Sequence, residues 1–180
     1  MKYSLQNTIE RFQKKEKIKF LFFWGHTAKD QITKTCFSQW YPCRFEENGI
    51  TYKTAEHFMM AEKARLFNDQ ENLDKILASG NPKQAKSLGR KVKNFDPVVW
   101  DQQKYDLVKR GNLLKFSQNE KLKEFLLATG NKIIVEASPY DKIWRIGMLE
   151  SDNRAENPLQ WNGQNLLGFA LMEVRDELKG

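Results

Sequence analysis

Two Asx-Pro pairs, Asn81-Pro82 and Asp96-Pro97, divide the middle of the chain and constrain its fold more than any other feature. Proline lacks the amide hydrogen that a helix interior needs, but it suits the first helical position, and an Asn or Asp before it can cap the helix start. The pairs therefore predict two successive helices, the second of which reaches about Gln118.

Helix signals also surround these two segments. Thr54 can cap a helix, and Gly80 and Gly130 can each follow the end of one. The spacing of Leu167, Leu171 and Leu178 predicts an amphipathic final helix. The further helices that we expect are Thr54–Asp69, Glu71–Ser79, Lys121–Ala128 and Asn165–Leu178.

Short apolar runs and one turn signal predict the strands. Phe20–Trp24 and Ile133–Val135 suit buried strands, and Asn48-Gly49 between Phe45 and Tyr52 is a strong hairpin signal. The sequence therefore predicts an α+β fold that is mainly helical, with a small mixed sheet surrounded by several helices.

A chain of 180 residues with 40% hydrophobic and 29% charged residues suits one globular core. We expect residues 1–17 to be a polar N-terminal extension and residues 18–180 to form the functional domain. No apolar run reaches the ~20 residues that span a bilayer, and no secretory signal is evident, so we expect a cytoplasmic protein without membrane contact.

The cysteines and histidines favour neither a disulfide framework nor a metal site. Cys36 and Cys43 are two thiols that suit a reducing compartment. Together with His26 and His57 they lack the paired short spacings of structural zinc sites, so no metal is expected.

The net charge of +7 favours phosphate-bearing partners. Because the lysines are spread along the chain, the charge alone does not establish nucleic-acid binding, and contact with DNA or RNA stays open.

Glu56 and Lys63 interrupt the apolar side of the first long helix. On a helical wheel both fall within the arc of Ala55, Met59 and Phe67, and they lie seven positions apart, or roughly 10.5 Å along the axis at 1.5 Å per residue. Because burying an unpaired charge costs several kcal/mol, the pair predicts a polar cavity that a ligand could enter.

A structural explanation of the same residues stays open. Lys63 could extend its stem along apolar surface, and Glu56 could simply favour the positive start of the helix. His57 we interpret as a hydrogen-bonded structural residue. We expect His57, Arg65, Asn68 and Asp69 on the other, solvent-facing side of the helix.

A second polar group follows the strand that ends at Val135. Glu136 comes directly after the strand, and Asp141 and Trp144 could present an acid and a flat ring to one pocket. The alternative is a capped turn beside a core tryptophan.

The long helix carries further polar insertions. Lys104 and Lys115 lie near its apolar stripe, where they could face a phosphate, although extension toward solvent is the explanation that we favour. Trp40 and Trp100 are flat surfaces that suit either the core or ring stacking.

Several motifs follow one another along the chain in a fixed order. They are Thr54-Ala55-Glu56-His57 through Lys63-Ala64, Ala85–Arg90, Gly111-Asn112 through Lys115-Phe116, Val135-Glu136, Asp141–Trp144 and Asn165–Gly168. This ordered set resembles the NADAR family, which includes YbiA-like proteins. The resemblance runs from about Phe20 to Leu178 and leaves residues 1–17 outside.

The resemblance implies an N-glycosidase that hydrolyses a ribose–nitrogen bond in a phosphate-bearing ribosyl substrate. It acts either on ADP-ribosylated guanine bases, in a nucleoside or in DNA or RNA, or on phosphoribosylated pyrimidine intermediates of riboflavin synthesis. The chain departs from the family pattern at Arg145, where many relatives have glycine. Arginine there could clamp a phosphate, alter the substrate or abolish activity.

Under this resemblance we expect Glu56, Lys63 and Asp141 to be catalytic. Glu56, or second Asp141, would stabilise positive charge on the sugar. Lys63 would orient a phosphate or ribose hydroxyl, protonate the leaving base, or attack the opened ribose as a Schiff base. The residues expected to bind substrate are Trp40, Trp100, Asn112, Lys115, Glu136, Trp144 and Arg145.

The chemistry requires no metal or redox cofactor. The alternatives to an enzyme are a catalytically silent module that binds ADP-ribose or nucleotides, for which Arg145 is the main argument, and a basic nucleic-acid-binding protein.

Overall fold

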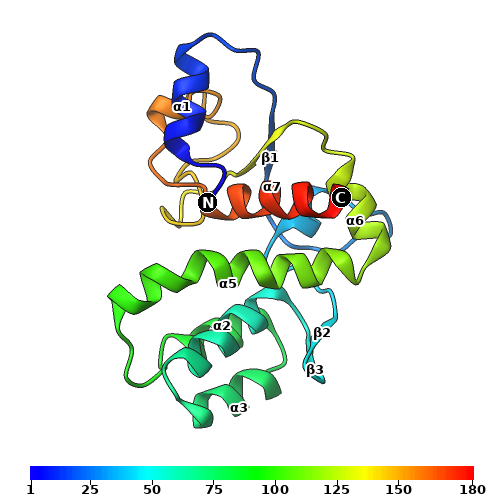
Figure 1. Ribbon diagram of the computed structural model, residues 1–180, viewed down its shortest axis with the longest axis vertical. Helices are drawn as coiled ribbons and strands as arrows, with labels where there is room; N and C mark the ends of the chain where they lie inside the picture. The colour runs from blue at the N-terminus through cyan, green and yellow to red at the C-terminus, as the bar shows by residue number, and fades with distance from the viewer. The chain divides into compact units, whose positions relative to one another are not determined.

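The computed structural model describes residues 1–180, which divide into two compact units. Unit 1 contains residues 1–38 and 120–180, and unit 2 contains residues 39–119. Figure 1 traces the chain through both units from blue to red. The predicted α+β class is confirmed, with helices as the main component.

Unit 1 is built around a pair of parallel strands that are distant in sequence. In it β1 pairs with β4, with Phe20 opposite Ile133 and Phe23 opposite Glu136. Helix α7 packs on β4. The elements of unit 1 are α1 (Leu5–Gln13), β1 (Phe20–Phe23), a 3-10 turn (Lys34–Phe37), α6 (Glu120–Leu127), β4 (Ile133–Glu136), a second 3-10 turn (Pro158–Gln160) and α7 (Leu166–Lys179).

A glycine permits the close packing of α7 on β4. A Cβ atom on Gly168 would lie 2.1 Å from the carbonyl oxygen of Ile134. Asn165, which precedes the helix with a φ of 55°, donates from Nδ2 to that carbonyl at 2.9 Å and accepts from the Glu136 amide at 3.0 Å. These contacts fix the end of β4 against the start of α7.

The N-terminal extension contains a helix and is bonded to α7. Ser4 caps α1, in which only Thr8 is buried. The Lys2 amide donates to Glu173 at 2.5 Å, and the Tyr3 hydroxyl donates to Asp176 at 2.7 Å. The boundary between an extension and a functional domain at residues 17 and 18 stays a prediction.

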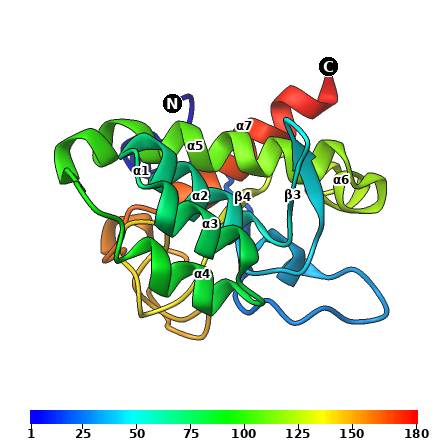
Figure 2. The same ribbon diagram turned by 90° about the horizontal axis from the view of Figure 1, so that it is seen from below.

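Unit 2 consists of a hairpin and four helices. The turn residues Asn48 and Gly49 have φ values of 53° and 77°, as the hairpin signal requires. Figure 2 shows α4 beside α2 and α3. The elements of unit 2 are β2 (Phe45–Glu47), β3 (Ile50–Tyr52), α2 (Ala55–Leu66), α3 (Gln70–Ala78), α4 (Pro82–Gly89) and α5 (Pro97–Ser117).

The predicted helix starts are confirmed by side-chain caps. The Thr54 side chain accepts from the His57 amide, Asn81 accepts from the Gln84 amide, and Asp96 accepts from the amides of Val98 and Val99. Each cap satisfies an amide that the first helical turn leaves without an intrahelical partner.

The predicted solvent face of α2 is wrong for two residues. His57 is 2% exposed and Asp69 is 5% exposed. For His57 the reason is that α3, α4 and α5 all pack against α2, so almost every side of its first half is covered. Asp69 lies beyond the end of α2, where its carboxylate caps α3 by accepting from the Asn72 amide. A single wheel assumes one buried face, which does not hold for a central helix.

The sheet also differs from the expected arrangement. The parallel and antiparallel pairings belong to two separate two-stranded sheets rather than to one mixed sheet. The two-residue turn directs β2 and β3 to pair with each other, whereas β1 pairs with a strand more than a hundred residues later. No helix in the structure is both long enough and apolar enough to cross a membrane.

The packing of α2 against α5 depends on Gly111. A Cβ atom there would lie 2.6 Å from Cδ1 of Phe58, whose side chain is fully buried. We expect Gly111→Ala to lower the free energy of unfolding by about 1–2 kcal/mol, since the clash in a packed core outweighs the helix propensity gained from alanine. Urea unfolding measures the change.

Gly80→Ala is the matched control, because its Cβ would approach nothing closer than Gln84 Oε1 at 3.5 Å. If Gly111→Ala leaves the free energy of unfolding unchanged or raises it, the proposed role of Gly111 in packing α5 against α2 is wrong.

Candidate active site

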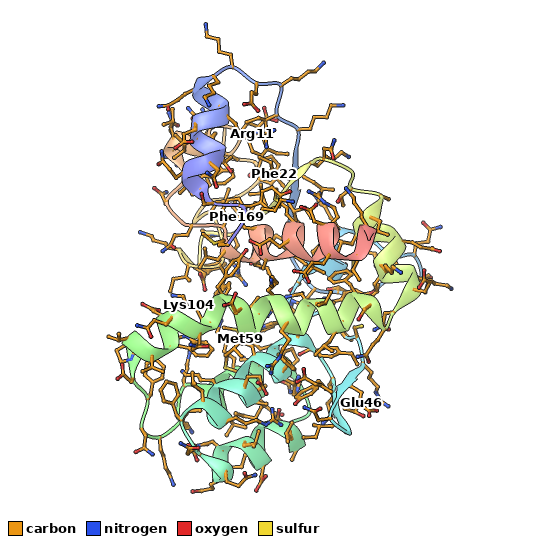
Figure 3. All side chains as sticks on the ribbon, viewed as in Figure 1. Arg11, Phe22, Glu46, Met59, Lys104 and Phe169 are labelled. Atoms are coloured by element: carbon orange, nitrogen blue, oxygen red, sulfur yellow. The ribbon has the colours of Figure 1, made fainter.

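Glu56 lies in the first turn of α2 and is buried. Its side chain and backbone together are 5% exposed. Its amide donates to the carbonyl oxygen of Gln39 at 2.9 Å. The aligned peptide dipoles at a helix start favour a negative charge there. Figure 3 labels Met59, which lies three residues further along the same helix.

Lys63 lies two turns further along α2, where its ammonium contacts aromatic rings. Nζ lies 4.0 Å from the ring centroid of Phe95 and 5.5 Å from that of Trp100. Lys63 forms no ion pair. Because burial removes water from the ammonium, the pKa of Lys63 is lower than its ordinary value. The structure thus brings the predicted residues Lys63 and Trp100 together.

Asn112 lies in the middle of α5 and is 0% exposed. Its Nδ2 donates to Gln39 Oε1 at 2.8 Å and to the Val108 carbonyl at 2.8 Å. Its Oδ1 is buried and has no hydrogen-bond partner. A buried acceptor without a donor costs roughly 1–3 kcal/mol, so this atom requires an explanation.

Lys115 is also 0% exposed, so extension toward solvent is the wrong explanation for this residue. Its Nζ lies 5.6 Å from the ring centroid of Tyr41 and 5.1 Å from that of Phe116. Burial raises the pKa of the nearby Cys43 thiol, and the charge of Lys115 opposes that rise. The ammonium is therefore held inside unit 2.

Two other predicted residues of unit 2 have ordinary surroundings. Lys104 pairs with Asp101 one turn earlier, at 2.6 Å. Trp40 is half-buried, and the ammonium of Lys86 lies 5.9 Å from its ring centroid.

The structural interpretation of His57 is confirmed. Its Nδ1 lies 2.8 Å from the Thr54 hydroxyl, and its Nε2 lies 3.3 Å from the Ser79 carbonyl. Because a carbonyl only accepts, Nε2 carries the hydrogen. Burial lowers the pKa of His57, and the neutral ring joins the start of α2 to the end of α3.

The second predicted group lies in unit 1; Glu136 is the last residue of β4, one residue later than the predicted strand end, and the other members follow the strand. Glu136 is 4% exposed, and its Oε1 lies 3.0 Å from Arg145 Nε. Arg145 also donates from Nη1 to the Ser138 hydroxyl at 3.0 Å. The arginine that departs from the family pattern thus pairs with another predicted residue of the same group.

Asp141 organises the loop that carries Trp144. Its Oδ1 accepts from the amides of Ile143 and Trp144 at 2.7 and 2.8 Å. The Trp144 carbonyl accepts from the Leu167 amide at 3.2 Å, in the first turn of α7. This is the capped turn that the sequence offered as an alternative, and it holds a half-buried tryptophan.

Two residues that the sequence did not single out join the predicted ones. Gln39 forms hydrogen bonds with both Glu56 and Asn112. The ring of Phe95 forms a cation–π contact with the Lys63 ammonium. Neither carried a signal: Gln39 lies in a loop, and Phe95 precedes a helix cap. Their roles follow only from tertiary contacts.

A groove elsewhere in unit 2 does not contain the predicted residues. It has a volume of about 450 Å³ and is lined by Lys75, Ala78, Ser79, Gln84, Ser87 and Leu88. It contains no carboxylate to stabilise a positive transition state, so its chemistry suits glycosidic cleavage less well than that of Glu56 and Lys63.

Comparison with known proteins assigns the chain to a family. The NADAR domain matches residues 22–179. An N-glycosidase of Acanthamoeba polyphaga mimivirus is 49% identical over 166 residues, which cover 88% of this chain and 96% of that protein. The chloroplastic riboflavin biosynthesis protein PYRR of Zea mays is 32% identical over 144 residues, covering 75% of this chain and 21% of that protein.

A solved structure supports the same assignment. The NMR structure of the Escherichia coli protein YbiA aligns with a TM-score of 0.72 and 27% identity, covering 89% of this chain and 85% of that chain. Since the family match extends over most of the sequence, this chain belongs to the NADAR family.

Proposed function

We propose that this chain is an N-glycosidase that hydrolyses a ribose–nitrogen bond in a phosphate-bearing substrate. The observation that carries the proposal is a buried carboxylate, Glu56, on the same helix as Lys63, an amine whose pKa is lowered by burial. The similarity to proteins named N-glycosidases supports the same reaction class.

Glu56 acts on the sugar. Breaking a ribose–nitrogen bond builds positive charge at the anomeric carbon, and a carboxylate held nearby stabilises that charge. The helix start and the bond from its amide to Gln39 hold the backbone of Glu56 in place. The backbone that carries the carboxylate is therefore in place before substrate binds.

Lys63 acts as the nucleophile. Its neutral amine attacks the anomeric carbon as the base leaves with a proton, and opening of the ribose ring then gives an imine. Water hydrolyses the imine and returns the free amine and the sugar. A lowered pKa favours this role, because only the neutral amine has a lone pair to donate.

The loop of unit 1 carries groups of its own that suit a base and a phosphate. There Trp144 offers a flat ring, and Asp141, whose Oδ1 accepts from two loop amides, positions that ring. Arg145 offers positive charge to a phosphate, while Glu136 and Ser138 orient its guanidinium. In unit 2, the residues that we propose for substrate binding are Trp40, Trp100, Asn112 and Lys115.

Two substrates fit this chemistry, since both join ribose to nitrogen and carry phosphate. One is guanine modified with ADP-ribose, in a nucleoside or in DNA or RNA. The other is a phosphoribosylamino-pyrimidine of riboflavin synthesis, which the name of the maize relative favours. The localisation that we propose is the cytoplasm, because two cysteines in 180 residues are typical of proteins in a reducing compartment.

The assay for this function measures product release from each substrate. The wild-type protein is expected to liberate free sugar phosphate or ADP-ribose from one of them. Glu56→Gln is expected to retain folding and ligand affinity while turnover falls at least about a hundredfold, the usual scale for loss of one group that stabilises transition-state charge. Chromatography of the released base measures the rate.

Glu46→Gln is the control, because Glu46 is an exposed hairpin residue, labelled in Figure 3. Tight binding without release from either substrate would indicate a silent binding module. A turnover that Glu56→Gln leaves intact would remove Glu56 from the mechanism.

Borohydride reduction tests the role of Lys63. Reduction during turnover is expected to leave a sugar covalently attached to Lys63, detected by peptide mass spectrometry, and the adduct is expected to disappear in Lys63→Ala. Lys83→Ala, an exposed lysine on α4, serves as the control. Repeated failure to trap an adduct from an active enzyme would favour direct attack by water.

The pH dependence of adduct formation provides a further test. Because burial lowers the Lys63 pKa, the neutral amine becomes populated below the ordinary lysine value of 10.5. The rate of adduct formation is expected to rise with pH and then to level off. The pH at which the rate is half-maximal is expected to lie below 10.5. A midpoint at or above 10.5 would contradict the proposed activation by desolvation.

A further inference from the structure

The orientation of the Asn112 amide is determined by its neighbours. The Val108 carbonyl can only accept, so the atom that faces it at 2.8 Å must be the amide nitrogen Nδ2. A flipped Asn112 would place Oδ1 against that carbonyl oxygen, which is repulsive. The Oδ1 position is therefore fixed by chemistry.

The orientation of Gln39 follows from that of Asn112. Because Nδ2 donates, the Gln39 atom at 2.8 Å must be the acceptor Oε1. The Gln39 Nε2 is then directed at the Met59 sulfur, a weak acceptor at 4.0 Å. All three contacts are consistent with a single arrangement of the two amides.

Gln39 also connects this amide pair to Glu56. Its carbonyl oxygen accepts from the Glu56 amide at 2.9 Å, while its side chain accepts from Asn112. One residue thus holds both the helix start that carries the proposed catalytic carboxylate and the amide of α5. Two hydrogen bonds and one side chain separate Asn112 from the backbone of Glu56.

The remaining atom of the group is the Asn112 Oδ1, which is buried and has no partner. Asn112 is 0% exposed, so bulk water does not compensate this acceptor. An oriented, buried acceptor that the protein itself leaves unpaired is suited to accept a hydrogen bond from a substrate donor. Replacing the substrate donor by hydrogen would leave the acceptor unpaired in the complex, which gives strong discrimination.

We propose that Asn112 Oδ1 accepts a hydrogen bond from the 2′-hydroxyl of the substrate ribose, and that Gln39 is the positioning residue that orients it. The inference rests on the proposed function, because it places the anomeric carbon near Glu56. The 2′-hydroxyl is the donor on the carbon next to the anomeric carbon, so it lies on the sugar close to the carboxylate. The enzyme is therefore selective for ribosyl over 2′-deoxyribosyl compounds.

Binding of sugar phosphates tests the contact without requiring turnover. Calorimetry with ribose 5-phosphate and with 2-deoxyribose 5-phosphate is expected to show about tenfold to a hundredfold tighter binding of the ribose compound. Asn112→Leu, which has a similar volume and no acceptor, is expected to bind the two equally. Equal binding by the folded wild-type protein would overturn the proposal, as would unchanged selectivity in Asn112→Leu.

The role of Gln39 is tested separately. Gln39→Met removes the acceptor for Asn112 but retains the backbone bond to Glu56, so selectivity between the two sugars is expected to fall toward that of Asn112→Leu. Gln39→Glu keeps an acceptor oxygen and is expected to retain most of the selectivity. A merely structural role would change the melting temperature of both variants and leave the ratio of affinities intact, which would overturn the positioning role.

The outcomes distinguish this inference from the proposed function. Sugar selectivity that depends on Asn112, without product release, supports the hydroxyl contact and contradicts the N-glycosidase reaction. Product release with no preference for the 2′-hydroxyl supports the reaction and contradicts the contact.

Discussion

The burial of α2 on nearly every side is the constraint on which the rest of the molecule depends. Residues Ala55–Ala61 are all buried, and this run includes the charged Glu56. A charge in such a position costs several kcal/mol unless local groups compensate it. The Thr54 cap, the close approach of α5 at Gly111 and the bond to Gln39 together hold the helix start that carries this residue.

Most of the local structure could be predicted from the sequence because short-range chemistry determines it. Asn81-Pro82 and Asp96-Pro97 begin helices, and Asn48-Gly49 forms a hairpin turn, since each depends on residues within about four positions. The separation into two sheets and the burial of His57 depend instead on contacts between distant segments. A single wheel contains no information about how many helices surround α2.

The candidate site was predictable to the extent that it violates the apolar pattern. Glu56 and Lys63 stood out because charged residues rarely interrupt an apolar face, and the family resemblance supplied the loop at Asp141 and Trp144. Gln39 and Phe95 could not be found this way, because an amide in a loop and a phenylalanine beside a cap are ordinary in sequence. The pairing of Arg145 with Glu136 likewise required the turn that follows β4.

The central claim is that the substrate sugar binds at the polar residues buried around α2. Titration of ¹⁵N-labelled protein with ribose 5-phosphate, followed by NMR, tests it most directly. The account predicts that the largest shifts occur at the Glu56 backbone amide and at the side-chain amides of Gln39 and Asn112. Shifts confined to the groove of Ala78, Ser79 and Ser87, with those three signals unmoved, would contradict it.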